Sequence, residues 1–133
     1  MTVIAACQLA LSVGDVTANR AAAAAAVAEA AGQGADLVVL PELSDSGYVF
    51  SGPAEARALA APATDSPTLR EWRALSVQYA IAVVGGFCEL GADGQLYNSA
   101  AVVAGDEVLT VYRKQPDGSW KAVADTFNSD TAM

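Results

Sequence analysis

The chain has 133 residues, of which 53% are hydrophobic and 17% are charged, as is typical of one globular domain with a buried core. Its net charge of −8 argues against partners such as nucleic acid or an anionic membrane surface, which are bound by clustered lysine and arginine. The sequence contains no histidine, which excludes Ser-His and Cys-His nucleophile pairs and His-ligated metal sites. Any chemistry must therefore use carboxylates, lysine, thiol or backbone groups.

Other totals point to a protein of the cytoplasm. The two cysteines, Cys7 and Cys88, make neither a zinc cluster nor a disulfide scaffold. No apolar run approaches the roughly 18 residues that suggest a membrane span. The first 15 residues lack the basic region and the cleavage site of a signal peptide.

The first half of the chain alternates strand-like and helix-like segments. Residues 2–11 form a short apolar run, and residues 35–42, "ADLVVLPE", form the continuous apolar run of a strand buried on both faces. Between them, Asp15 or Thr17 can cap an alanine-rich helix that two glycines end. A further helix is expected over about residues 54–60.

Ser66 and Pro67 predict the start of another helix. Its expected apolar face comprises Leu69, Trp72, Leu75 and Val77. Strands then follow on both sides of a turn at residues 91–95, and a second turn at residues 116–119 leads to a last strand. The order of elements, βαβααβββ plus one hairpin arm, predicts an α/β chain.

Two charged residues stand where strands end. Glu42 follows Pro41 at the carboxyl end of a buried strand, where α/β folds place ligand sites, and could act as a general base or simply cap a loop. Lys114 ends a later strand and could stabilise an oxyanion, although a solvated lysine is the simpler interpretation. Gly85 and Gly86 do not form a phosphate loop, because no lysine or helix start follows them.

Several motifs in the same order resemble the N-terminal half of a nitrilase-superfamily carbon–nitrogen hydrolase. They are "GADLVVLPELSDSGY", "VVGGFCELGADGQLYNSAAVVAGDEVLTVYRK" and the opening segment before them, and together they cover residues 2–114. The resemblance implies a domain at residues 1–114 with an incomplete αββα sandwich of the kind that usually dimerises. It also implies cofactor-free hydrolysis of a small amide, nitrile or carbamoyl substrate.

The resemblance assigns roles to three residues. Glu42 matches the general base and Lys114 the oxyanion-stabilising lysine of a Glu–Lys–Cys triad, in which a thiolate forms a thioester-type intermediate that water resolves. Tyr48 matches a loop that lines the substrate pocket, although a packed loop aromatic is an equal alternative. Asn98 and Ser99 match a strand motif and are interpreted as hydrogen-bonding partners.

The third member of that triad has no counterpart after Lys114, since residues 115–133 contain no cysteine. Cys7 is interpreted as a packed strand residue. Cys88 precedes Lys114, which is the wrong order for the family, and is also interpreted as packed. We therefore expect the chain to be inactive alone, unless Cys88 or a partner chain supplies the thiol.

The tail, residues 115–133, departs from the family pattern. Its "DGSW" and "NSD" resemble the last strand of ketosteroid-isomerase-like, SnoaL-like proteins, which suggests a chimeric chain. We expect the tail to form a terminal β-hairpin strand with Trp120 and Phe127 facing the core.

Half of a sandwich leaves one face of its sheet uncovered. We expect Val38, Leu40, Val83 and Val102 on that face, and self-association into a homo-oligomer to cover it. The alternative function is that of a non-enzymatic acidic α/β interaction module that docks through this face.

Overall fold

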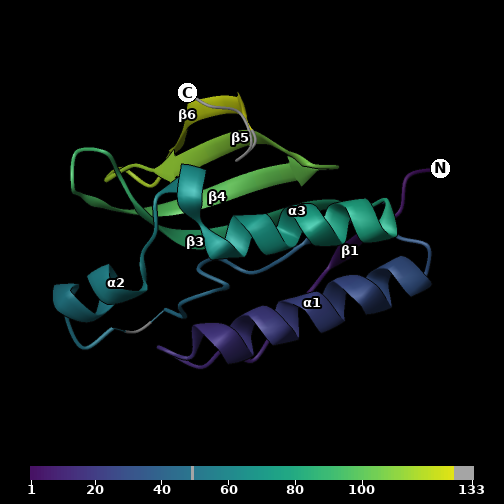
Figure 1. Cartoon of the computed structure of the whole chain (residues 1–133), viewed down its shortest axis with the longest axis horizontal. Helices are drawn as coiled ribbons and strands as arrows, with labels where there is room; N and C mark the ends of the chain where they lie inside the picture. The colour runs from purple at the N-terminus through teal and green to yellow at the C-terminus, as the bar shows by residue number, and fades with distance from the viewer. Residues whose placement is uncertain (49, 128–133) are drawn as a thin grey trace.

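The computed structural model describes residues 1–48 and 50–127, and side chains as far as residue 123 (Figure 1). The strands are β1 Ile4–Ala6, β2 Leu37–Val39, β3 Ala82–Leu90, β4 Leu96–Ala104, β5 Glu107–Lys114 and β6 Trp120–Phe127. The helices are α1 Val16–Gly32, α2 Pro53–Leu59 and α3 Pro67–Tyr79, with a short 3₁₀ turn at Ala63–Asp65.

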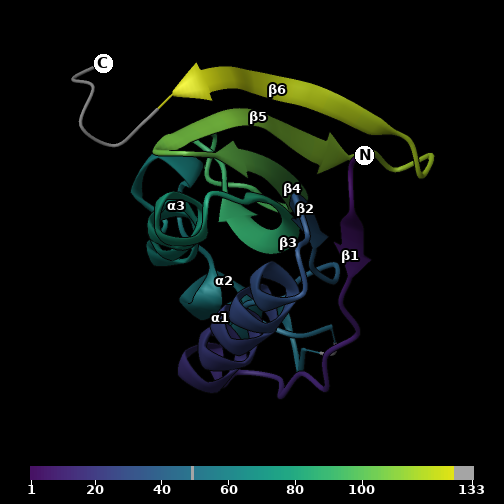
Figure 2. The same ribbon diagram turned by 90° about the vertical axis from the view of Figure 1, so that its right-hand side faces the viewer.

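The six strands form one sheet in sequence order, which confirms the α/β class. Strands β1, β2 and β3 are parallel, whereas β3, β4, β5 and β6 form an antiparallel meander. Helices α1 and α3 lie beside each other on the same face of the sheet (Figures 1 and 2). We call this the helix face, and the opposite one the open face.

The helices begin where the sequence predicts. The Asp15 carboxylate accepts the Ala18 amide at 3.0 Å at the start of α1, and the Ser66 hydroxyl accepts the Leu69 amide at 3.2 Å at the start of α3. Among the residues that the structure describes, no helix is both long and apolar enough to cross a bilayer.

The first two strands are shorter than their apolar runs. The segment predicted as a strand over residues 2–11 is one only at Ile4–Ala6, and that over 35–42 only at Leu37–Val39. Strand β1 lies at the sheet edge and pairs with β2 alone. The hydrogen bonding between the two strands continues for one residue past β1, where the Cys7 amide donates to the Val39 carbonyl at 2.9 Å. The apolar runs in the sequence are therefore longer than the segments that pair as strands.

The helix face carries the core, and this corrects the predicted open face. Val38, Leu40 and Val83 are buried in one cluster with residues of α1 and α3, so their placement on the uncovered face was wrong. Only Val102, which pairs with Val84, belongs to the open face, where both are partly buried. A continuous apolar run has no alternation of apolar and polar residues, so the sequence does not show which of its side chains face the helices.

Helix α3 shows how closely this core is packed. Leu69, Trp72 and Leu75 are buried as predicted, but Val77 is 60% exposed and was assigned to the wrong face. The Trp72 indole lies against Gly85 of β3, where a Cβ atom would stand 2.6 Å from the ring. Gly85 is therefore a packing residue, since any side chain there would displace the indole.

The tail forms the predicted terminal strand. A turn joins β5 to β6, with the Gln115 amide donating to the Ser119 carbonyl at 2.7 Å and Gly118 in the left-handed region at φ +86°. Trp120 is 44% exposed, so the prediction that it faces the core was wrong. It pairs with Lys114, whose side chain lies on the open face. The predicted orientation of the Phe127 side chain falls outside the described residues.

Candidate active site

Glu42 and Lys114, 72 positions apart in the sequence, meet on the open face. Glu42 lies in the loop after β2 and Lys114 at the end of β5, and the Lys114 Nζ atom is 3.4 Å from Glu42 Oε1. Their side chains are 33% and 42% exposed, respectively, so the pair is reachable from solvent. The Asn98 side chain, from β4, also donates a hydrogen bond from Nδ2 to Glu42 Oε1.

The Glu42 loop lies directly on the backbone of β3. A Cβ atom at Gly86 would stand 2.6 Å from Glu42 Cα and 2.5 Å from Leu43 N, which leaves no room for a methyl group. The Gly86 amide donates to the Pro41 carbonyl at 3.1 Å, and its carbonyl accepts both the amide and the hydroxyl of Ser44, at 2.9 and 3.0 Å. Gly86 thus sets how closely the backbone at Glu42 approaches strand β3.

Asp45 ties the same loop to three elements, β3, α3 and α1. Its carboxylate accepts the Cys88 amide of β3 at 3.2 Å and the Thr68 hydroxyl of α3 at 3.1 Å. Its carbonyl accepts the Asn19 side chain of α1 at 2.9 Å. Burial raises the pKa of the Asp45 carboxyl, although the bonds from Cys88 and Thr68 oppose the rise. Asp45 therefore serves as a structural tether and not as the cation ligand that an acidic loop residue can suggest.

A second ion pair lies on the helix face, one residue from the first. Arg113 donates from Nε and Nη2 to the two Glu89 oxygens at 2.8 and 3.0 Å, and the Ser99 hydroxyl donates to Glu89 Oε1 at 2.7 Å. Glu89 is 4% exposed. Because neighbouring strand residues point to opposite faces, Arg113 stabilises the packed side while Lys114 is presented on the open side.

Cys88 has a buried thiol that is poorly suited to nucleophilic attack. Its Sγ atom donates to the Ala56 carbonyl of α2 at 3.7 Å, and the residue is 5% exposed. Burial, assisted by the charge of Asp45, raises the pKa of the Cys88 thiol to about 11. With this pKa the Cys88 thiol is protonated at neutral pH. Since the thiolate is the nucleophilic form of cysteine, Cys88 behaves as a packed residue.

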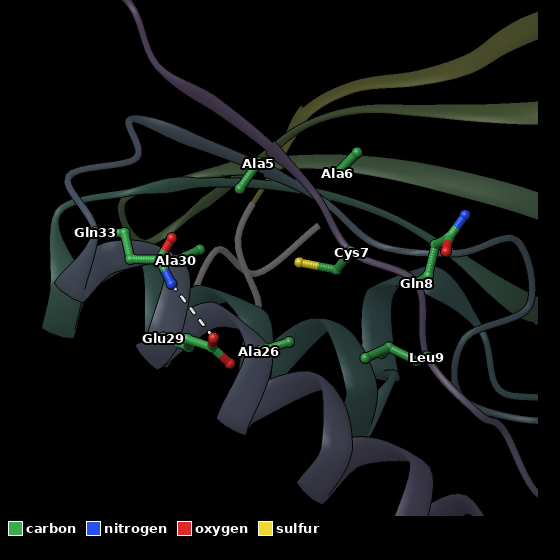
Figure 3. A pocket seen from close by; sticks show the side chains of 9 residues that line it. All are labelled: Ala5, Ala6, Cys7, Gln8, Leu9, Ala26, Glu29, Ala30 and Gln33. Carbon is green, nitrogen blue, oxygen red and sulfur yellow. Dashed lines mark hydrogen bonds between the residues drawn. The ribbon is translucent and has the colours of Figure 1, made fainter.

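Cys7 borders a separate hollow of about 260 Å³ between the segment after β1 and helix α1 (Figure 3). Glu29 and Gln33 are on its helix side, joined by a hydrogen bond from Gln33 Nε2 to Glu29 Oε1 of 3.3 Å. Burial, followed by the Glu29 charge, raises the pKa of the Cys7 thiol. The lining residues include neither Glu42 nor Lys114, so this hollow is distinct from the candidate site.

Tyr48 is 52% exposed, and its side chain makes no hydrogen bond to the residues that the structure describes. Its predicted contact with substrate remains a prediction. Within residues 1–48 and 50–127 no three Cys, Asp or Glu side chains gather in a way that could hold a metal ion.

The assembled site offers a carboxylate, an ammonium and an amide on one solvent-facing surface. Such a set can accept a proton and stabilise a developing negative charge. The sequence predicts site roles for Glu42 and Lys114, but for Asn98 only a general role in hydrogen bonding. The hydrogen bond from Asn98 to Glu42 joins residues 56 positions apart. The one indication of it in the sequence is that Asn98 and Lys114 occupy positions on adjacent strands whose side chains point to the same face.

Residues 3–120 match the carbon–nitrogen hydrolase family. The chain is 38% identical over 88 residues to a nitrilase of Pyrococcus abyssi, which covers 66% of this chain and 33% of that protein. It is 35% identical over 111 residues to a glutamine-dependent NAD(+) synthetase of Acinetobacter baylyi, covering 84% of this chain and 20% of that protein. The chain thus spans a third or less of the length of these curated relatives.

Solved structures agree. An amidase of Nesterenkonia sp. AN1, with acrylamide added at its active-site cysteine, superposes with a TM-score of 0.72 and 26% identity over 89% of this chain and 47% of that one. An N-terminal amidase gives a TM-score of 0.73 with 21% identity, over 84% of this chain and 27% of that one, and supports the fold alone.

We predict that Gly86→Ala destabilises the chain by about 1–3 kcal/mol, because the methyl group would overlap the backbone at Glu42 and Leu43. Gly32→Ala is the matched control, since nothing lies within 4 Å of a Cβ atom there and Gly32 ends a helix, where alanine is favoured. Urea denaturation followed by circular dichroism gives both values. Equal stability of the two variants would contradict the close packing of the Glu42 loop against Gly86.

We predict a pH-dependent effect of Asp45→Asn. Because the folded-state pKa of Asp45 is raised, its contribution to stability is fully present below its unfolded pKa near 3.8 and is lost as pH rises through the folded value. The free energy of unfolding of the wild type, minus that of Asp45→Asn, should therefore increase as pH falls from 7 toward 4. Urea titrations at several pH values measure it, and a difference that decreases with falling pH would show that the ionised form is favoured instead.

Proposed function

This chain belongs to the carbon–nitrogen hydrolase family, and we propose that it carries the general base and the oxyanion-binding lysine of an amidase- or nitrilase-type site. Glu42 is the base and Lys114 the cation. The observation that supports this most directly is the 3.4 Å contact between Lys114 Nζ and Glu42 Oε1, which the loop after β2 and the end of β5 build on an accessible face. A small amide, nitrile or carbamoyl compound is the proposed substrate class.

The proposed chemistry for an amide proceeds in two steps. Glu42 accepts the proton of a cysteine thiol as the sulfur attacks the substrate carbon, and Lys114 stabilises the oxyanion that forms. Glu42 then gives that proton to the departing amine, which leaves a thioester. Water hydrolyses the thioester, with Glu42 taking one water proton and returning it to the sulfur.

The thiol is the part that this chain does not supply in a suitable form. Cys88 is buried and held protonated, and residues 115–133 contain no cysteine. We therefore propose that the 133-residue chain alone is hydrolytically inactive. The site becomes complete when another polypeptide segment brings a thiol over the open face.

We predict no turnover when the chain alone is assayed with small aliphatic amides, nitriles and ureido acids. Iodoacetamide followed by mass spectrometry should leave Cys88 unlabelled in the folded chain. A chimera that joins residues 1–114 to the part of the Nesterenkonia amidase holding its active-site cysteine should hydrolyse amides, and Glu42→Gln or Lys114→Ala should abolish this by at least about 100-fold. A chimera whose turnover survives both substitutions would refute the roles of Glu42 and Lys114.

A second candidate function follows from the exposed groups on the open face. Ile4 is 60% exposed, Tyr112 38% and Trp120 44%. We propose as the alternative that the chain is a non-enzymatic module that self-associates through this face. Light scattering tests self-association through this face, because a stoichiometric dimer that Tyr112→Ser dissociates supports it and a monomer opposes it.

A further inference from the structure

Asn98 connects β4 to the Glu42 loop. It precedes Ser99, which pairs with Arg113, just as Lys114 follows Arg113 on the antiparallel neighbour. Asn98 and Lys114 therefore lie side by side on the open face. The Asn98 amide donates from Nδ2 to Glu42 Oε1, and the Lys114 Nζ atom is 3.4 Å from the same oxygen.

We propose that Asn98 is a positioning residue that holds Glu42 by Oε1 and so makes Oε2 the oxygen that accepts protons. This inference rests on the proposed function, in which Glu42 is the base. Among the residues that the structure describes, no hydrogen bond is made to Oε2. With Gly86 fixing the Glu42 backbone from below, a second restraint at Oε1 fixes the direction of the remaining oxygen.

Lys114 cannot provide this restraint throughout the reaction. In the proposed chemistry its ammonium group turns toward the developing oxyanion, which weakens its attraction to Glu42 at the moment of proton transfer. The Asn98 amide is neutral and does not bind the oxyanion in this scheme. It therefore keeps Glu42 oriented while Lys114 changes partner.

A purely structural role explains Asn98 less well. Its Oδ1 atom is buried and has no hydrogen-bond partner among the described residues, an arrangement that lowers stability. An asparagine kept only for strand structure would be expected to use both ends of its amide. Within the described part of the chain, the hydrogen bond of the Asn98 side chain is the one to Glu42.

The first test uses the chain as it is. In ¹⁵N–¹H spectra at pH 7, Glu42→Gln should shift the side-chain NH₂ signals of Asn98, because the charged acceptor is replaced by a neutral amide. The Asn19 side chain, which binds the carbonyls of Ser12 and Asp45, is the internal control and should not shift. Asn98 signals that do not respond would overturn the proposal.

The second test separates positioning from stability. Asn98→Leu should leave the urea midpoint unchanged or higher, because it removes a buried unpaired carbonyl, while the ¹³C order parameter of the Glu42 side chain falls. Ser99→Ala is the matched control, since Ser99 bonds Glu89 on the helix face and should leave the order of Glu42 unchanged.

Two results would sink the inference. One is an unchanged order parameter of Glu42 in Asn98→Leu. The other is a large fall of the urea midpoint in both Asn98→Leu and Asn98→Ala, which would make Asn98 a structural residue. Failure of the proposed function would be visible elsewhere, as chimera turnover that does not depend on Glu42, with the Asn98 signals still responding to Glu42→Gln.

Discussion

The close approach between the Glu42 loop and the backbone of β3 is the constraint on which the site depends. At Gly86 the strand has no side chain, so the loop at Glu42 and Leu43 rests directly on the peptide backbone. The two Ser44 bonds to the Gly86 carbonyl and the Asp45 bond to the Cys88 amide fasten it there. Leu43 adopts a left-handed conformation at φ +46°, which this network of bonds sustains. Glu42 thereby gains a fixed position although it lies outside regular secondary structure.

The same stretch of sheet separates a buried ion pair from an accessible one. Arg113 and Lys114 are adjacent in the sequence, yet Arg113 pairs with buried Glu89 and Lys114 with accessible Glu42. Strand alternation alone sends them to opposite faces. Each cation has a carboxylate partner, so the end of β5 carries two ion pairs on opposite faces of the sheet.

Much of this arrangement could be predicted from sequence. Caps at Asp15 and Ser66 and the turn at residues 91–95 located the elements, and the family resemblance assigned Glu42 and Lys114 to one site. The face of Val38, Leu40 and Val83 could not be predicted, because apolar runs lack alternation. Trp120 was predicted on the wrong face because the composition of a strand does not show which of its alternate residues face the helices. The contact of Asn98 with Glu42 could not be predicted without the register of β4 against β5.

The two adjacent glycines give β3 a feature with a wider consequence. Gly85 admits the Trp72 indole from the helix face, and Gly86 admits the Glu42 loop from the open face. At this point only one layer of peptide groups separates the hydrophobic core from the Glu42 loop. Changes that repack the core around the indole are therefore transmitted to the carboxylate without any intervening side chain to absorb them. A substitution in α3 that repacks the indole is consequently expected to shift the backbone on which the Glu42 loop rests.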